Sequence, residues 1–206
     1  MGNLSVAISA GGKSSRMGTD KSFVMLNGKP LIEHLIARVS GLGQDETFIV
    51  TNKPEAYTHL GLPMVSDVIP DKGSLGGIYT ALHHSKHDYT VVIGCDMPFA
   101  NADLLRYMIG LREAPDGPFD VIVPRVENYP EGLHAIYTKT CLPHIRERLD
   151  ADRLNVIGFY PKVRVRYLDE AEYEPFDLKH LSFFNVNTPD ELAQAEQIAA
   201  NGDRSA

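Results

Sequence analysis

The sequence predicts an α/β protein whose mostly parallel central sheet is covered by helices on both faces. Short β-branched runs alternate with helical segments along the chain. Several of these runs are apolar without interruption, which is typical of strands buried on both faces. The chain has 206 residues, of which 43% are hydrophobic, and this is enough for one sizeable core. We therefore expect a single domain over residues 1–200 and a frayed tail over residues 201–206.

Strands are expected over the β-branched runs, and each is expected to stop at glycine, proline or polar turn residues. In chain order, the predicted strands are residues 4–9, 47–51, 64–66, 89–94, 119–123, 134–137, 163–168 and 183–186. The run over residues 89–94 has the pattern of a central strand, because it offers no polar face. The first strand stops at Ala10, Gly11 and Gly12.

Helices are expected where apolar residues recur at helical spacing. The predicted helices are residues 31–39, residues 76–84, a helix after Asn101, residues 142–149 and a last helix from residue 189 onwards. Pro30 opens the first of these, and Asn101 can cap the third. The last has the strongest local signal, since Thr188 is placed as N-cap, Pro189 at the first helical position and Glu191 at the third.

Composition excludes several classes of function. The chain carries 20 basic and 27 acidic residues, a net charge of −7, so a general nucleic-acid binder is not expected. No apolar run reaches the roughly 20 residues that span a bilayer, and no basic segment precedes a long apolar stretch as in a secretory signal. Two cysteines cannot form a disulfide framework. These features predict a soluble cytoplasmic protein that binds neither nucleic acid nor membrane.

The segment over residues 9–21 is the most informative for chemistry. It follows the first strand, where ligands of parallel sheets bind, and its glycines expose backbone amides that favour anions. Lys13, Arg16 and Lys21 gather three cations within nine residues. The segment is not a Walker loop, because the first glycine would fall at Ala7. The alternative is a polar turn between strand and helix.

Asp96 follows the predicted strand over residues 89–94 and precedes Pro98. A carboxylate at the carboxyl end of a central strand can hold Mg²⁺ beside the phosphates of a nucleotide, since Mg²⁺ is commonly bound by one or two carboxylates plus phosphate oxygens and water. The alternative is an aspartate that starts or caps the next loop. The glycine segment favours the metal hypothesis.

Two further places can contact a ligand. Residues 70–77 form a second glycine-rich entry to a helix, on which a base or ribose could rest, and Asp67 ends the short strand before it. Asn185 and Asn187 end the last predicted strand and offer donors and acceptors to a heteroatom-rich ligand. Ordinary turns and local capping are the alternatives at both places.

Taken together, these segments resemble the molybdenum cofactor guanylyltransferases. The resemblance covers nearly the whole chain in the family's order and is carried by residues 9–21, 26–31, 49–52, 67, 73–77, 95–98 and 185–192. The first block is shared by many nucleotidyltransferases. The double glycine at 11 and 12 and the closing Asn-Val-Asn-Thr-Pro block narrow the resemblance to the guanylyl branch.

The resemblance implies a three-layer Rossmann-like nucleotidyltransferase fold with a mostly parallel central sheet. It implies transfer of GMP from GTP to the molybdopterin-bound molybdenum cofactor, with pyrophosphate released, and exchange of cofactor with a donor protein and an acceptor molybdoenzyme. The GTP site would comprise Ser9, Ala10, Gly11, Gly12, Lys21, Asn52, Asp67 and Asp96. Asp96 would bind Mg²⁺ and act in catalysis with Arg16 and Lys21. Asn185 and Asn187 would face the pterin substrate.

The chain departs from the family pattern at three places. Ser9 stands where leucine is usual, Ser74 where proline is usual, and residues 131–134 where a Pro-Leu-His run is common. Two rival functions stay open at this point. One is another nucleotidyltransferase, with a cytidylyl donor or with a sugar or alcohol phosphate as acceptor. The other is a non-catalytic nucleotide-binding adaptor that hands cofactor to a molybdoenzyme.

Overall fold

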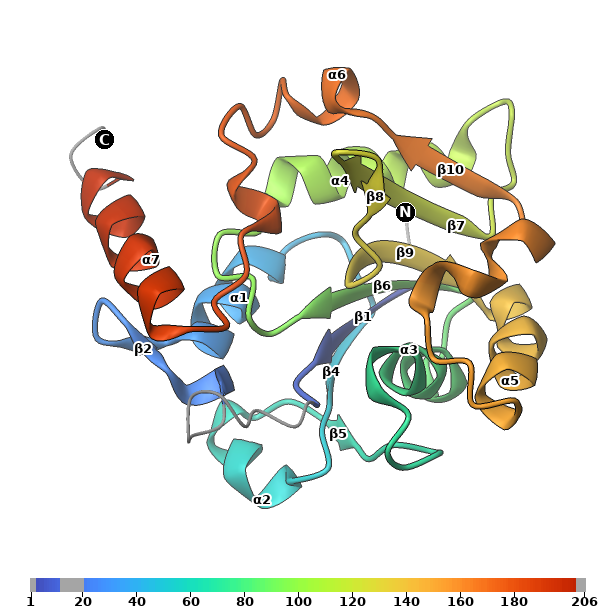
Figure 1. Cartoon of the computed structure of the whole chain (residues 1–206), viewed down its shortest axis with the longest axis horizontal. Coiled ribbons are helices and arrows are strands. Elements are labelled where there is room, and N and C mark those ends of the chain that lie inside the picture. The colour runs from blue at the N-terminus through green and yellow to red at the C-terminus, as the bar shows by residue number, and fades with distance from the viewer. Residues whose placement is uncertain (1–2, 12–20, 203–206) are drawn as a thin grey trace.

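The structure, a computed structural model, describes residues 3–11 and 21–202. An eight-stranded mixed sheet lies at its centre, with helices on both faces (Figure 1). The strands of this sheet are β1 (Leu4–Ser9), β4 (Glu46–Val50), β5 (Met64–Val65), β6 (Tyr89–Gly94), β7 (Val121–Val126), β8 (Tyr129–Pro130), β9 (His134–Thr138) and β10 (Val165–Leu168). A separate short hairpin is formed by β2 (Met25–Leu26) and β3 (Lys29–Pro30).

The sheet is mostly parallel, as the sequence predicts. Its order is β10-β7-β9-β6-β1-β4-β5, and β8 pairs with β7 at the side. The pairs β1–β4, β1–β6, β4–β5 and β7–β10 are parallel, whereas β9 runs antiparallel to both β6 and β7. Ser9 lies opposite both Val50 and Gly94, so the carboxyl ends of β4, β1 and β6 are level. Strands β4 and β5 lie on one side of β1, and β6 lies on its other side. The carboxyl ends of these strands therefore form the switch point where ligands bind in such sheets.

Five helices in the described part of the chain fall close to their predicted positions, whereas two short ones, Pro54–Tyr57 and Glu170–Tyr173, were not predicted. The helices are α1 (Leu31–Val39), α2 (Pro54–Tyr57), α3 (Gly73–His84), α4 (Ala102–Gly110), α5 (Leu142–Asp150), α6 (Glu170–Tyr173) and α7 (Pro189–Gly202). The predicted caps are confirmed: the Asn101 side chain accepts hydrogen bonds from the amides of Asp103 and Leu104, and Thr188 Oγ1 accepts one from the Glu191 amide at 3.2 Å. Among the described residues, no helix has the length and apolar character needed to cross a lipid bilayer.

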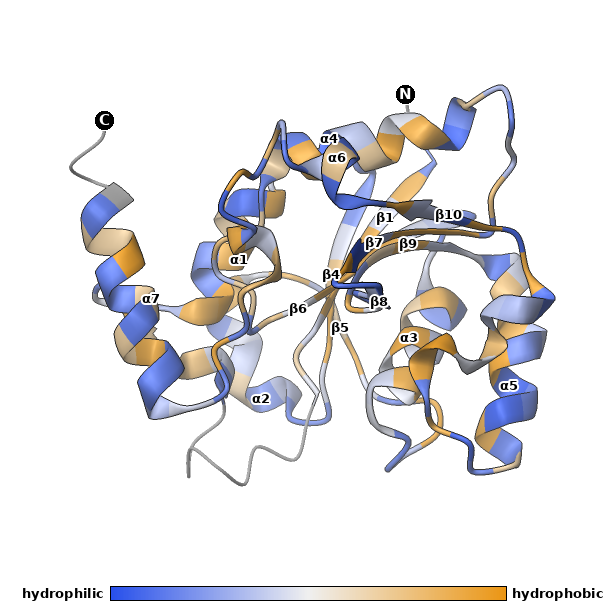
Figure 2. Cartoon of the chain, turned by 45° about the horizontal axis from the view of Figure 1, so that its top comes forward, coloured by the Kyte–Doolittle hydropathy of each residue, from blue (hydrophilic) through white to orange (hydrophobic). Residues whose placement is uncertain are grey.

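Two cores cover the two faces of the sheet. Val6 and Ile8 of β1 pack with α1 and α4 on one face, whereas Ala7 packs with α3 and α5 on the other, as expected from the alternation of side chains along a strand. Figure 2 shows the hydrophobic strands between these helix layers. A third, smaller cluster joins α7 to the β2–β3 hairpin through Leu26, Val186 and neighbouring apolar residues. This contact holds α7 beside the carboxyl ends of the strands.

One strand predicted from the sequence is not formed. The strand predicted over residues 183–186 is wrong: Leu181–Phe183 form a 3-10 turn, and the chain then crosses the end of β6, where the Val186 amide donates to the Asp96 carbonyl at 2.9 Å. Its apolar residues are buried by packing rather than by pairing in the sheet, and a periodic pattern does not distinguish these two. Helix α7 continues through Gly202, and residues 203–206 of the predicted tail lie outside the described residues.

Candidate active site

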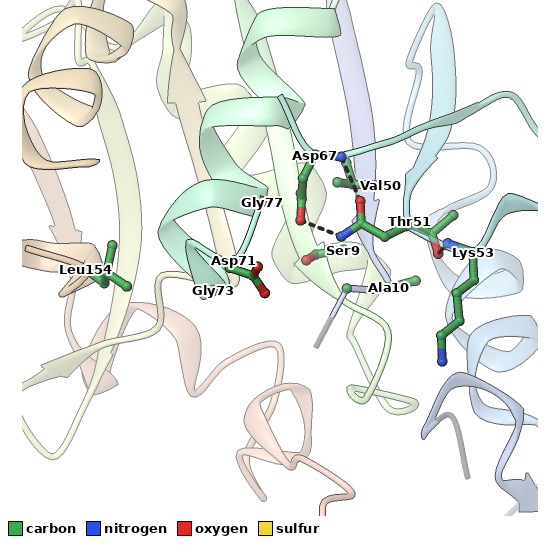
Figure 3. Close-up of a pocket in the computed structure, with 12 residues that line it drawn as sticks. Ser9, Ala10, Val50, Thr51, Lys53, Asp67, Asp71, Gly73, Gly77 and Leu154 are labelled. Carbon is green, nitrogen blue, oxygen red and sulfur yellow. Dashed lines mark hydrogen bonds between the residues drawn. The ribbon is translucent and has the colours of Figure 1, made fainter. Parts of the chain in front are cut away.

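A cavity of about 370 Å³ opens at the carboxyl ends of β1, β4 and β5. Its walls are the residues that follow these strands, the first turns of α3 and one residue from the loop after α5 (Figure 3). The lining residues are Ser9, Ala10, Gly11, Val50, Thr51, Asn52, Lys53, Asp67, Asp71, Gly73, Gly77 and Leu154. The fold therefore brings together five residues that the sequence assigns to a nucleotide site, namely Ser9, Ala10, Gly11, Asn52 and Asp67.

Asn52 and Asp67 form a doubly hydrogen-bonded pair in this cavity. Asn52 Nδ2 donates to Asp67 Oδ2 at 2.7 Å, and the Asp67 amide donates to Asn52 Oδ1 at 2.9 Å. The pair forms because Val50 and Val65 are opposite each other in β4 and β5, and each polar residue follows two positions later. The Thr80 hydroxyl of α3 lies 3.4 Å from Asp67 Oδ1 and bonds to the Gly76 carbonyl at 2.9 Å. The orientation of the Asp67 carboxylate is therefore set from two sides.

Helix α3 approaches β1 closely because Gly77 has no side chain. A Cβ atom at this position would lie 3.3 Å from Ser9 Oγ, a contact tight enough to displace the serine or the helix. The Ala10 amide donates to the Val50 carbonyl at 2.9 Å, so the chain stays bonded to β4 for one residue beyond β1. Backbone atoms of small residues thus form the floor of the cavity, which lets a ligand rest against the main chain.

A second polar cluster lies on the other side of β1, at the end of β6. The Cys95 amide donates to the Ser9 carbonyl at 3.0 Å, and Asp96 follows directly. Lys21 Nζ donates to Asn187 Oδ1 at 2.5 Å. The main-chain amide of Asn187 donates to Glu191 Oε2 at 2.6 Å. Three segments far apart in the sequence meet here because the loop before α7 crosses the end of β6.

The Asp96 side chain lies over the end of its own strand. A Cβ atom at Gly94 would be 2.7 Å from Asp96 Oδ1, so only glycine allows the carboxylate this position. Burial raises the pKa of Asp96; the nearby Lys21 ammonium and a backbone hydrogen bond oppose this rise, and the Glu191 carboxylate adds to it. The negative charge on Asp96 is therefore only partly compensated by the protein, and a bound cation would stabilise it.

The Asp96 carboxylate fits a magnesium ion that is also bound by phosphates. Among the described residues, no three His, Cys, Asp or Glu side chains gather closely enough to hold a metal by themselves. Mg²⁺ usually keeps several waters and takes one or two carboxylates plus phosphate oxygens. One half-buried carboxylate would meet that requirement if phosphates were bound beside it, and Asp96 is half-buried.

The remaining predicted site residues have different positions. Lys21, Asp96, Asn185 and Asn187 are not among the described residues that line the cavity. Asn185 Nδ2 donates to the Phe183 carbonyl at 3.0 Å, which is the local capping considered as its alternative. Gly12 and Arg16 lie outside the described residues.

Two cavity residues had no part in the sequence-based hypothesis. Lys53 lies next to Asn52 at the end of β4, and its position after a strand was a usable signal. Leu154 comes from the loop after α5. An apolar residue in a loop carries no local mark of a site, and only the packing of α5 beside α3 brings it to the cavity.

The chain is similar to known proteins over most of its length. A family model described as "MobA-like NTP transferase domain" matches residues 6–162. A probable molybdenum cofactor guanylyltransferase of Pelotomaculum thermopropionicum is 39% identical over 197 residues, which cover 94% of this chain and 92% of the relative. Another, from Peptoclostridium acidaminophilum, is 35% identical and covers 94% of this chain and 89% of its own length.

A solved structure shows the same fold. The molybdopterin-guanine dinucleotide biosynthesis protein A from Archaeoglobus fulgidus superposes with a TM-score of 0.83 at 29% identity. The superposition covers 96% of this chain and 99% of that protein. The likeness therefore extends over nearly the whole length of both chains.

Proposed function

The chain belongs to the family described as the MobA-like NTP transferase domain, and from this membership we propose that it transfers GMP from GTP to the molybdopterin-bound molybdenum cofactor. The products are the guanine dinucleotide cofactor and pyrophosphate. The observation that carries the proposal is the pair of sites at one sheet edge: a cavity lined by backbone and the Asn52–Asp67 pair, and a cluster of Lys21, Asp96 and Asn187 across the end of β1.

The cavity receives the base and ribose of GTP. The Asp67 carboxylate accepts hydrogen bonds, and guanine offers two neighbouring donors, its ring N–H and its exocyclic amino group. Adenine offers an acceptor at the ring nitrogen, so it would leave a carboxylate oxygen unpaired. Asn52 fixes the carboxylate for this task, because both of its side-chain groups are bonded to Asp67. Ser9, Ala10, Gly11 and Gly12 contact the nucleotide through the main chain.

The chemical step needs positioning and neutralisation of charge. An oxygen of the terminal phosphate of the pterin attacks the α-phosphorus of GTP, a new P–O bond forms, and the bond to pyrophosphate breaks. A phosphate monoester is already anionic near neutral pH, so no strong general base is required. Lys21 and Arg16 offset the charge that grows on the leaving pyrophosphate.

Asp96 is the residue that would hold Mg²⁺, which when bound neutralises charge on the phosphates. Asn185 and Asn187 are proposed to orient the pterin. Asn187 already accepts a hydrogen bond from Lys21, so the acceptor would lie next to the cation that faces the triphosphate. A donor protein and an acceptor molybdoenzyme would supply the pterin and take the product.

The direct test is incubation of the purified protein with molybdopterin-molybdenum, Mg²⁺ and each of the four nucleoside triphosphates in turn. Pyrophosphate release is measured, and GMP attached to the pterin is identified by mass spectrometry. GTP is expected to give the product and the other nucleotides little. A preference for CTP would favour the cytidylyl alternative. Nucleotide binding without any product would favour the adaptor.

A pair of variants tests the assignment of the base site. Asp67→Asn replaces an acceptor-only group by an amide and is expected to lower kcat/KM for GTP by about tenfold or more, with a smaller effect on competing nucleotides. Asp103→Asn is the matched control, since Asp103 is an exposed residue of α4 that pairs with Arg106. Equal effects of the two changes would contradict the role of Asp67.

A further inference from the structure

A buried pair of hydroxyl groups lies beneath the polar cluster, between Tyr57 of α2 and Ser22 of the short 3-10 turn Lys21–Phe23. Both residues are fully buried. The Tyr57 hydroxyl donates to Ser22 Oγ at 2.8 Å and lies 3.4 Å from the carbonyl oxygen of Ala10, the residue that follows β1. One hydroxyl from α2 therefore contacts Ala10, which precedes Gly11 and Gly12 in the sequence, and Ser22, which follows Lys21.

The hydroxyl pair continues to the end of β6. Ser22 Oγ donates to Cys95 Sγ at 3.2 Å, and the Cys95 amide donates to the Ser9 carbonyl. Ser22 follows Lys21, and Cys95 precedes Asp96. The bonds thus join the backbone that carries the cation to the backbone that carries the carboxylate, by a path that does not involve the charged groups themselves.

The hydroxyls do more than fill the core. A phenylalanine at position 57 would keep the ring contact with Phe23, whose centroid is 4.8 Å away, and would spare the cost of desolvating a hydroxyl. A lysine side chain is long and flexible, so the position of its ammonium group depends on how firmly its backbone is held. In the described structure, the Ser22 side chain ties this backbone to Cys95, the residue before Asp96.

We propose that Tyr57 and Ser22 are positioning residues that hold Lys21 at its working distance from Asp96. This inference rests on the proposed function, because it assumes that Lys21 faces the triphosphate. The hydroxyls touch neither nucleotide nor acceptor, and they act through Lys21. Their contribution is to keep the ammonium group in place before GTP arrives, so that binding does not have to order it.

The first experiment compares Tyr57→Phe with Tyr160→Phe. Tyr160 is a matched control, because its buried hydroxyl also bonds to a second hydroxyl, that of Tyr137, at 3.0 Å, but on the face covered by α5. Tyr57→Phe is expected to lower kcat/KM for GTP by about tenfold, whereas Tyr160→Phe is expected to change it by less than about twofold. Thermal unfolding is measured for both. Equal losses of activity in the two variants would overturn the proposal.

The second experiment is a double-mutant cycle with Lys21→Ala. If Tyr57 acts through Lys21, Tyr57→Phe loses its effect on kcat/KM when Lys21 is already alanine, so the two changes are not additive. Additive losses would overturn the proposal, since they would show that the tyrosine supports the enzyme in another way. Ser22→Ala removes the middle hydroxyl and serves as a second variant in the same cycle.

The test of this positioning role can be distinguished from the test of the proposed function. If the wild-type protein transfers a nucleotide other than GMP, the proposed function is wrong, and the same cycle is measured with the nucleotide that it does transfer. If the wild-type protein transfers GMP and Tyr57→Phe and Ser22→Ala both retain its kcat/KM, the proposed function stands and the positioning role is wrong.

Discussion

His134 gives a quantitative prediction for the dependence of stability on pH. This histidine of β9 is fully buried, and neither ring nitrogen has a hydrogen-bond partner among the described residues. Its ring packs edge-on against Phe183, with centroids 5.2 Å apart. Burial lowers the pKa of His134 to about 4, and the Asp177 carboxylate only partly opposes this effect. The imidazole is therefore neutral in the folded protein throughout the physiological range.

The sign of the effect follows from the two pKa values. In the unfolded chain the imidazole takes up a proton near its ordinary pKa of 6.5, whereas in the folded protein it does so only near 4. The unfolded state therefore binds more protons between these values, and stability falls as pH falls. Linkage gives a loss of about 2 kcal/mol between about pH 7.5 and about pH 5, and a limit of about 3.4 kcal/mol below both pKa values.

The assay is urea unfolding of the wild type and of His134→Leu at these two pH values. The leucine variant lacks the titrating group and also the two unpaired nitrogens, so it is expected to be close to the wild type in stability at the higher pH. On going from the higher to the lower pH, the stability of the leucine variant relative to the wild type is expected to rise by about 2 kcal/mol. All other titrating groups are shared by the two proteins. Parallel pH dependence would refute the reasoning, as would an imidazole of the folded wild type that titrates near 6.5.

Three further predictions concern the site and its support. Asp96→Asn is expected to lower turnover by at least about 100-fold without lowering the midpoint of thermal unfolding, because burial raises the pKa of Asp96 and a neutral amide avoids the cost of a buried charge at neutral pH. Gly94→Ala would place a Cβ 2.7 Å from Asp96 Oδ1, so steady-state turnover is expected to fall by about tenfold, and wild-type turnover would contradict this account of the strand end. Thr188→Ala removes the N-cap of α7 and is expected to cost about 1 kcal/mol in denaturant unfolding, with no change in KM for GTP.

Local signals in the sequence were sufficient for most of the fold. The strands over residues 4–9 and 89–94 were predicted at the bounds that the structure shows. Both are mainly apolar runs; the first stops before Ala10 and Gly11, and the second ends at Gly94. The caps at Asn101 and Thr188 were predicted because a side-chain oxygen at a helix start bonds to amides within three residues. The strand predicted over residues 183–186 is wrong, since burial by a crossing loop and burial in a sheet produce the same apolar pattern.

The site was predictable only where it depends on strand ends. Ser9, Asn52 and Asp67 each lie at or just past the carboxyl end of a parallel strand, and parallel strands bring such positions together whatever the loops between them do. Leu154 and the Lys21–Asn187 contact depend on how α5 and α7 pack. Those arrangements follow from contacts between distant residues, for which a single sequence contains no periodic signal.

The position of β1 between the two clusters constrains where the reaction would occur. Ser9 is paired with Val50 on the side of the cavity and with Gly94 on the side of Asp96. A nucleotide with its base against Asp67 must therefore pass its phosphates over the end of β1 to reach Lys21 and Asp96. This path is open only if the residues that follow β1 are small, and the described ones are Ala10 and Gly11. We therefore expect the α-phosphorus of GTP to lie above the gap between the ends of β1 and β6, where an acceptor phosphate held near Asn187 can approach it from the side opposite the leaving pyrophosphate.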